Sequence, residues 1–296
     1  MTMFVRLVAS RAVSTLWGAS AVVLVSAAAV QAGGRLVSYE DATRRGLVRG
    51  WYAQAPVDTT RSRVSQWKLQ YDRAYAVTTS GLLAAFDAET GETLWTTSIG
   101  AAGAAAFGPG ANLDYLAVVS ASRLYLIDRN DGHVIWQRDL GSAPAAGPAL
   151  SDEYAYVSLV NGRVEAFSLN DSAAQPWYYQ SEGRTFQRPT HSGDVVCWPT
   201  TTGRLYVCSA NKPNVLFRLQ TNDEIVAPPA EQSPYLFAAS RDGYLYCVHE
   251  ITGAEKWRFS AGDAIESQPV VIGGKACVAP REPPPETLHG ENAGGQ

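Results

Sequence analysis

FDAETGETLW, residues 86–95, is an apolar stretch that leads into a polar turn and then into a tryptophan. The same form recurs in LIDRNDGHVIW (126–136), AFSLNDSAAQPW (166–177), VCSANKPNVLF (207–217) and CVHEITGAEKW (247–257). The aromatics that close the five copies are separated by 41, 41, 40 and 40 residues: Trp95, Trp136, Trp177, Phe217 and Trp257. A second series, of small turn residues, keeps this period upstream: Gly81, Ser122, Gly162, Gly203 and Gly243. Two series with a period of about 40 residues indicate a repeat protein.

A β-hairpin precedes the closing aromatic in each repeat. In YAVTTSGLLAAFD (75–87), two stretches of alternating apolar residues flank a turn at Ser80-Gly81. Repeats of ~40–45 residues with several short strands are typical of β-propellers, in which each repeat forms one four-stranded blade. The Ala-, Gly- and Pro-rich segments between hairpins, such as 98–110 and 140–150, are expected to hold the innermost strands, where backbones converge. We therefore expect an all-β fold, a β-propeller of four-stranded blades.

The repeat pattern predicts a propeller over residues 51–280 with five full units and part of a sixth. The full units are 51–95, 96–136, 137–177, 178–217 and 218–257. Residues 260–280 match the opening of the earlier units, but the pattern then stops. Residues 281–296 have the composition of a disordered Pro-rich tail. The sequence leaves open whether strands from both ends share a blade and close the ring.

The N-terminal region has a different composition. Residues 1–32 begin with Arg6 and Arg11, continue with an uncharged apolar stretch and end in small residues, which is the pattern of a cleaved signal peptide. An uncleaved N-terminal membrane anchor is the alternative, since about 20 uncharged residues span a bilayer. Either alternative predicts an exported protein in the periplasm or cell envelope. Residues 33–50 are expected to form a linker or short helix that begins near Ser38.

The bulk composition limits the choice of partners. A net charge of −4 and a pI near 5.6, without a basic run in the mature region, argue against nucleic-acid binding. Membrane contact is expected only through the N-terminal segment, if it stays uncleaved. A protein or an envelope component is the expected partner.

The closing segment FDAETGETLW resembles the repeat of the pyrroloquinoline-quinone (PQQ)-like propellers, whose units end in an Asp, a Thr-Gly-like turn and a Trp. The resemblance covers residues 51–280, and the motif is strong at Asp87, Gly91 and Trp95 and at Asp128, Gly132 and Trp136. In this family the Trp packs between adjacent blades. The resemblance therefore implies structural roles for Trp95, Trp136, Trp177 and Trp257.

Two branches of the family imply different functions. The quinoprotein dehydrogenases carry a pair of adjacent cysteines over the quinone, whereas the four cysteines of this chain, Cys197, Cys208, Cys247 and Cys277, are scattered. The outer-membrane assembly propellers of the BamB type use the same repeat as a noncatalytic scaffold. The resemblance thus implies an exported, noncatalytic scaffold without cofactor or metal, and PQQ is not expected. A remnant or subunit of a PQQ-dependent oxidoreductase is the alternative.

Polar residues in the turns are better explained by structure than by chemistry. Residues 128–132 carry alternating oxygen ligands like a calcium loop, but lack the acidic residue that should follow, and Asp and Asn also stabilise tight turns. Glu89, Asp131 and Glu250 are interpreted as solvated turn residues. We expect the recurring Tyr125, Tyr206 and Tyr246 to pack between blades rather than to line a binding surface.

Cys197 and Cys208 are the candidates for a disulfide. A two-residue turn at Thr202-Gly203 would place them directly opposite each other, because residue numbers of opposed pairs would then sum to 405. An oxidising compartment would permit a bond. Two free, packed thiols are the alternative. Asn161-Gly162 and Asp242-Gly243 are likewise expected to form two-residue type I′ turns.

Overall fold

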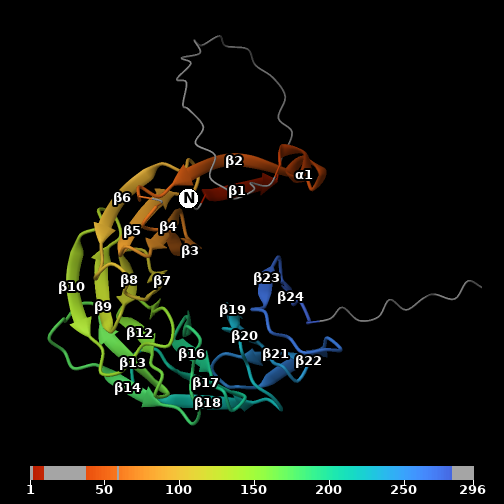
Figure 1. Ribbon diagram of the computed structural model, residues 1–296. Helices are drawn as coiled ribbons and strands as arrows, with labels where there is room; N and C mark the ends of the chain where they lie inside the picture. Colours follow the sequence, from red (N-terminus) through yellow and green to blue (C-terminus); the bar gives the residue numbers. More distant parts are fainter. Residues whose placement is uncertain (1–2, 10–37, 59, 282–296) are drawn as a thin grey trace, which may run out of the picture.

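Alternating apolar residues produce five antiparallel sheets of four strands each. The structure is a computed structural model that describes residues 3–9, 38–58 and 60–281. Figure 1 shows the sheets arranged as blades along an arc, with their first strands facing the centre. The expected all-β propeller is therefore confirmed, and the Ala- and Gly-rich segments contain innermost strands as predicted.

Each blade contains four consecutive strands. The first blade holds β3 (Val64–Gln70), β4 (Arg73–Thr78), β5 (Leu82–Asp87) and β6 (Thr93–Ser98). The second holds β7 (Ala106–Ala111), β8 (Tyr115–Ser120), β9 (Arg123–Asp128) and β10 (Val134–Asp139). The third holds β11 (Ala149–Leu150), β12 (Tyr154–Ser158), β13 (Arg163–Ser168) and β14 (Trp177–Gln180). The fourth holds β15 (Thr190–Ser192), β16 (Val195–Pro199), β17 (Arg204–Ser209) and β18 (Val215–Gln220), and the fifth β19 (Ala230–Gln232), β20 (Tyr235–Ala239), β21 (Tyr244–His249) and β22 (Glu255–Ser260).

The hydrophobic core lies between the blades. The second and third strands of each blade are buried on both faces, so each blade contributes side chains to two clusters. One cluster joins Tyr75 and Trp95 of the first blade to Leu116 and Ile127 of the second, and further clusters join the later blades pairwise. Burying the apolar faces of neighbouring blades against each other supplies the main stabilisation of the arc.

Two-stranded pairs stand at the two ends of the arc (Figure 1). At one end β2 (Leu47–Gln54) pairs with β1 (Met3–Ala9), and at the other β23 (Val270–Ile272) pairs with β24 (Lys275–Cys277). The sequence prediction began the first unit at residue 51, but the first blade begins with β3 and β2 belongs to a separate sheet. Figure 1 shows the two end pairs apart from each other.

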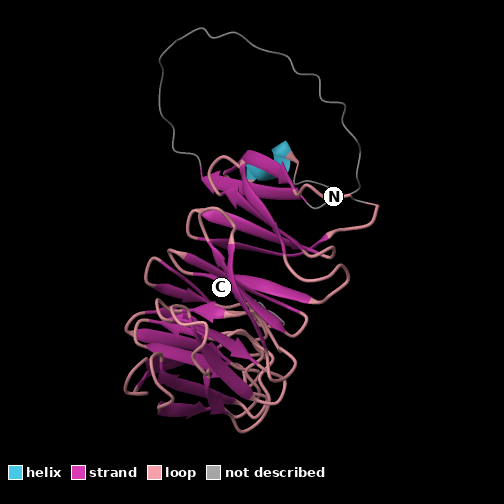
Figure 2. Ribbon diagram, turned by 90° about the vertical axis from the view of Figure 1, so that its left-hand side faces the viewer, coloured by secondary structure: helices cyan, strands magenta, loops and turns pink. Residues whose placement is uncertain are grey.

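The N-terminal region contains α1 (Tyr39–Arg44), the one helix among the described residues (Figure 2). The Ser38 hydroxyl caps this helix by accepting a hydrogen bond from the Asp41 amide at 3.0 Å, where the sequence predicts a helix start. Among the described residues, no helix has the length and apolar character needed to cross a membrane. Most of the predicted signal peptide or anchor (residues 10–32) and the tail from residue 282 lie outside the described residues.

The hairpin turns differ from the prediction by one residue. In the fourth blade Pro199 pairs with Leu205, and the loop between the strands contains three residues that end in Gly203. Gly203 has a φ of +72°, and a side chain there would meet the carbonyl oxygen of Asp223 at 2.5 Å. The expected type I′ turns are wrong for the same reason: only the glycines at 162 and 243 have positive φ, as in a three-residue loop.

Candidate functional site

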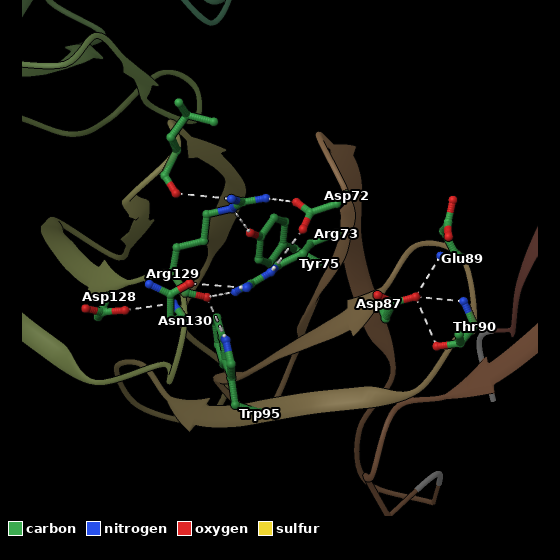
Figure 3. Close-up of polar contacts among 11 residues, drawn as sticks. Asp72, Arg73, Tyr75, Asp87, Glu89, Thr90, Trp95, Asp128, Arg129 and Asn130 are labelled. Carbon is green, nitrogen blue, oxygen red and sulfur yellow. Dashed lines mark hydrogen bonds and ion pairs between the residues drawn. The ribbon is translucent and has the colours of Figure 1, made fainter.

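The closing tryptophan of the first blade fastens it to the second. Trp95 is 8% exposed, and its Nε1–H donates to the Arg129 carbonyl at 2.9 Å (Figure 3). Its ring lies against the turn of the next blade, so that a Cβ on Gly132 would come within 2.5 Å of the indole. Gly132 also has a φ of +79°, which L side chains rarely adopt. The turn glycine of one blade therefore provides the space into which the closing tryptophan of the preceding blade packs.

Trp51 makes the same contact and was missed by the sequence prediction. Its indole donates to the Ala88 carbonyl at 3.1 Å and lies against Gly91 of the first blade. Trp51 lies 44 residues before Trp95, outside the period of 40 to 41 that defines the ladder. The signal that could have found it is local: VRGWYAQ resembles the aromatic-centred outer strands of the repeats.

The other aromatics of the ladder show variations of this contact. Trp136 donates to the Leu169 carbonyl at 3.3 Å, and Phe217 lies on Gly253 without an N–H to donate. The Trp177 ring packs edge-on against the Tyr154 ring, with centroids 5.5 Å apart, but its Nε1 has no hydrogen-bond partner among the described residues. The Ala210 carbonyl accepts a hydrogen bond from the Tyr156 hydroxyl. Trp257 differs from the other aromatics of the ladder, because it is 39% exposed.

A polar network backs the Trp95 contact. Arg129 donates from Nε to the Tyr75 hydroxyl at 3.0 Å, pairs with Asp72 and donates to the Leu113 carbonyl (Figure 3). Arg73 donates to the Arg129 carbonyl. The Arg129 side chain is 7% exposed, so its charge and its donors are held at the interface between the first two blades. This network has a structural role, since every group serves the contact between blades.

The turn carboxylates serve the backbone, as the sequence predicts for residues 128–132. Asp128 accepts from the Asn130 amide at 2.7 Å, and Asp87 accepts from the amides of Glu89 and Thr90 (Figure 3). Glu250 contradicts the prediction of a solvated residue. It is 6% exposed and accepts hydrogen bonds from the Ser192 and Ser233 hydroxyls.

The predicted opposition of Cys197 and Cys208 is wrong. The three-residue turn pairs Cys197 with Val207 and Cys208 with Val196, so the two thiols point to opposite faces of the sheet. Cys197 contributes to the cluster between the fourth and fifth blades, and Cys208 to the cluster between the third and fourth. All four cysteines are free thiols, which is the alternative that the sequence left open.

We expect native alkylation to separate Cys277 from the other three cysteines. Burial raises the pKa of Cys208 to about 12 and also raises the pKa of Cys197 and of Cys247, whereas Cys277 is exposed. Because the thiolate is the reactive form, iodoacetamide at pH 8 should modify one cysteine in the native protein and four after denaturation. Intact-mass spectrometry reads the count. If the denatured protein gained two further modified cysteines only after a reductant was added, two of the cysteines would form a disulfide, and the assignment of four free thiols would be wrong.

The centre of the arc contains a channel of about 360 Å³ lined by residues from the innermost strands of all five blades. Lys68 and Arg188 both face this channel, and Arg188 reaches across it to donate to the Gly108 carbonyl. Burial, together with repulsion by Arg188, lowers the pKa of Lys68 to about 8, and burial lowers that of Arg188 to about 10. Within the described residues neither cation forms an ion pair with a carboxylate, so their charges cost stability.

Replacing Lys68 with methionine should stabilise the protein by about 1–3 kcal/mol at pH 7. The folded state releases the Lys68 proton near pH 8, but the unfolded chain holds it to about 10.5. Unfolded protein therefore binds more protons between these values, and the stability of the wild type rises with pH there. Urea unfolding measured between pH 7 and 10.5 should show this rise in the free energy of unfolding for the wild type and for Lys275→Met, which replaces an exposed lysine. The Lys68→Met variant should not show the rise. Equal slopes in all three would contradict the assignment.

A groove of about 820 Å³ lies between the outer strands of the third and fourth blades. The wall of the groove contains the exposed Gln180, Arg218 and Gln220, and its floor is Tyr206. The Arg218 guanidinium carbon lies over the Tyr206 ring, 5.1 Å from the ring centroid. Tyr206 stacks on the buried Trp198 with ring centroids 5.9 Å apart, so the floor of the groove is backed by the core between the third and fourth blades. Tyr206 is 3% exposed, and Tyr125 and Tyr246 are similarly buried, which agrees with the predicted packing role.

An exposed aromatic extends this groove along β14. Tyr178 is 48% exposed, and the Arg163 guanidinium lies 4.3 Å from the centre of its ring. Arg163 also donates to Gln180 at 3.2 Å, which connects Tyr178 to the groove wall. Tyr and Arg are the residues that most often dominate protein–protein contacts. We call Arg163, Tyr178, Gln180, Arg218 and Gln220 the Arg–Tyr groove.

The residues that a quinone would need are not brought together. Cys197, Cys208 and Cys247 lie in separate buried clusters or strands, and Cys277 lies at the edge of the arc. The described residues also contain no group of three His, Cys, Asp or Glu that could hold a metal ion. The chain therefore does not offer the adjacent cysteines that hold PQQ in the dehydrogenase branch.

Comparison with known proteins finds a family similar to part of the chain. Residues 120–227, which include all five residues of the Arg–Tyr groove, match the family described as outer membrane protein assembly factor BamB. This segment is similar to the BamB-type PQQ-like repeat. The resemblance found in the sequence is thereby confirmed for the BamB-like branch. No curated protein matches the chain.

Solved structures show the same fold at low sequence identity. BamB from Moraxella catarrhalis is 18% identical with a TM-score of 0.59, and the match covers 73% of this chain and 67% of that one. The computationally designed Ika8 protein is 12% identical with a TM-score of 0.60 and the same two coverages. The Cps50 (Swd1) β-propeller domain of Myceliophteria thermophila is 13% identical, with a TM-score of 0.56 and coverages of 66% and 72%. These matches show that the chain has a β-propeller fold.

Proposed function

We propose that this chain is an exported, noncatalytic β-propeller scaffold that binds a protein partner during outer-membrane protein assembly. The observation that carries the proposal is the match of residues 120–227 to the BamB family. The predicted signal peptide over residues 1–32 supports a periplasmic or envelope location. The fold suits a scaffold, because propeller blades hold loops and outer strands rigidly while their surface residues vary.

The Arg–Tyr groove is the proposed contact surface for that partner. It combines an exposed aromatic with Arg163 and Arg218, and lies within or beside strands that the family match includes. Planar guanidinium groups pair with carboxylates and stack on aromatic rings. The partner is therefore expected to present acidic and aromatic side chains to this groove.

Affinity capture from an envelope extract tests the groove directly. Arg218→Ala removes one exposed guanidinium from the groove, while Arg61→Ala removes another exposed guanidinium far from it in the sequence. We expect Arg218→Ala to lower the amount of captured partner at least tenfold, the loss of one hot-spot side chain, and Arg61→Ala to leave it unchanged. Both variants should keep the wild-type melting temperature. Equal capture by both variants would exclude the groove as the contact surface.

A further inference from the structure

The central channel contains two cations that no carboxylate of the described chain neutralises. Lys68 lies on β3 of the first blade, and Arg188 lies just before β15 of the fourth. The Lys68 ammonium forms neither a hydrogen bond nor an ion pair with any described residue. Of the described residues that line the channel, only Glu231 is acidic, and it is exposed and pairs with neither cation. Removing two positive charges from water without a counter-ion costs free energy.

The position of Arg188 depends on two glycines that leave room for its guanidinium. Its Nη2 donates across the channel to the Gly108 carbonyl, which lies where the register of β7 against β8 shifts. A Cβ on Gly147 would lie 2.7 Å from the same nitrogen, so a larger residue there would displace the guanidinium. The other two nitrogens of Arg188 form no hydrogen bond with a described residue. Their N–H groups are therefore available to a ligand in the channel.

Two uncharged polar side chains of the channel wall bond to the backbone. Gln70 donates to the Ala111 carbonyl at 2.6 Å and accepts from the Ala111 amide at 3.1 Å. Thr190 donates to the Pro229 carbonyl at 3.1 Å. Proline, which has no backbone N–H, occupies further positions of the wall: Pro148, Pro189, Pro228 and Pro229. The charged donors that remain free to meet a ligand are those of the two cations.

We propose that the channel binds a small oxyanion, with a carboxylate or phosphate group held between Lys68 and Arg188. Ammonium and guanidinium groups bind such oxygens through charge-assisted hydrogen bonds, which are stronger than neutral ones. The channel volume of about 360 Å³ lies within the range of small-molecule sites and is too small for a folded partner. A bound anion supplies the counter-ion that the described chain lacks. The site is independent of the Arg–Tyr groove and of the proposed scaffold function.

Isothermal titration calorimetry of the full chain with sodium sulfate and with sodium succinate, at pH 7 and constant ionic strength, tests the site. We expect saturable binding of at least one probe, and sulfate or succinate alone would indicate a phosphate-like or a carboxylate ligand. Lys68→Met and Arg188→Gln should each lower the affinity roughly tenfold or more, because each removes one charged donor. Arg188→Gln keeps an N–H donor for the Gly108 carbonyl. Lys275→Met, which replaces an exposed lysine outside the channel, should bind like the wild type.

The dependence of binding on pH separates the charge of Lys68 from its packing. Burial and repulsion by Arg188 lower the pKa of Lys68 to about 8, so wild-type affinity should fall roughly tenfold between pH 7 and pH 9 as this charge is lost. Lys68→Arg keeps a charge over this range and should keep its affinity. Three other titratable residues line the channel: Tyr71, His191 and Glu231. Burial lowers the pKa of His191, and phenol and carboxyl groups ordinarily titrate outside this range.

Two results would overturn the proposal. The first is a folded wild-type protein that binds neither sulfate nor succinate saturably. The second is an affinity that Lys68→Met leaves unchanged, since Lys68 has no described partner whose loss could disturb the channel indirectly. Far-UV circular dichroism verifies that each variant is folded. Arg218→Ala should bind the anions like the wild type, so failure at this site is distinguishable from failure of the Arg–Tyr groove.

Discussion

Replacing Trp95 with alanine is expected to lower the free energy of unfolding by about 3–5 kcal/mol, the usual cost of truncating a buried tryptophan. The ring is 8% exposed and fills the space between Gly132 and the cluster shared by the first two blades. Truncation would leave a cavity between blades and remove the indole hydrogen bond to the Arg129 carbonyl, which would keep its hydrogen bond from Arg73. Urea denaturation followed by circular dichroism measures the loss.

Two variants separate packing from position in the ladder. Trp95→Phe keeps a ring but loses the N–H, as Phe217 does naturally, and should cost about 1–2 kcal/mol. Trp257→Ala removes a ring that is 39% exposed on the fifth blade and should cost less than half as much as Trp95→Ala. Equal losses at positions 95 and 257 would show that Trp257 is packed as closely as Trp95 in solution, against the structure described above.

Replacing Arg129 with alanine is expected to cost about 2–4 kcal/mol, since truncating one partner of a buried network leaves the others without it. The variant would lose the hydrogen bonds to the Tyr75 hydroxyl and the Leu113 carbonyl and the pair with Asp72. Asp72 is 65% exposed and can be solvated, so the larger part of the loss comes from Tyr75 and from the packing of the arginine stem.

A double-mutant cycle with Tyr75→Phe identifies the coupling within this network. Tyr75→Phe alone should cost about 1 kcal/mol, and the double variant should cost less than the sum of the two single variants because both remove the same hydrogen bond. Arg129→Lys keeps the charge but not the planar fork, and should recover only part of the loss. Strict additivity of the two single losses would show that the Arg129–Tyr75 hydrogen bond contributes nothing.

The fold was accessible from the sequence because the blades repeat. The aromatic series from Trp95 to Trp257 and the turn series from Gly81 to Gly243 report the same contact in successive blades, so each copy supports the others. The resemblance to the PQQ-like repeat rested on the clearest copies, Asp87–Trp95 and Asp128–Trp136, whereas the choice of the BamB branch rested on the scattered cysteines and the lack of a catalytic set. Composition also placed two innermost strands correctly, because β7 and β11 lie in the Ala-, Gly- and Pro-rich segments.

Features that occur only once in the chain could not be predicted from the sequence. Trp51 lies outside the period, because its strand, β2, belongs to a two-stranded sheet with β1 and not to one of the four-stranded blades. The predicted pairing of Cys197 with Cys208 was wrong by one residue. Two-residue and three-residue turns differ little in sequence when both contain glycine, yet this difference places the two cysteines on opposite faces of the sheet. The burial of Glu250 depends on Ser192 and Ser233, which are distant in sequence and come together only between blades.

The surface features required the structure for a similar reason. The Arg–Tyr groove combines residues of β14 and β18, from two repeats in which the turn glycine of the motif is lost, so their sequence attracts little notice. The channel cations, Lys68 and Arg188, lie 120 residues apart and meet only because the innermost strands converge. Such neighbours follow from the arrangement of the blades, and local sequence patterns do not report them.

The role in outer-membrane assembly is best measured in the source organism as the amount of β-barrel proteins in the outer membrane after the chain is depleted. We expect depletion to lower this amount at least twofold. Wild-type protein and Arg61→Ala should restore it, whereas Arg218→Ala should not, although it accumulates to the same level. Unchanged β-barrel protein after depletion, or full rescue by Arg218→Ala, would contradict a scaffold that acts through the Arg–Tyr groove.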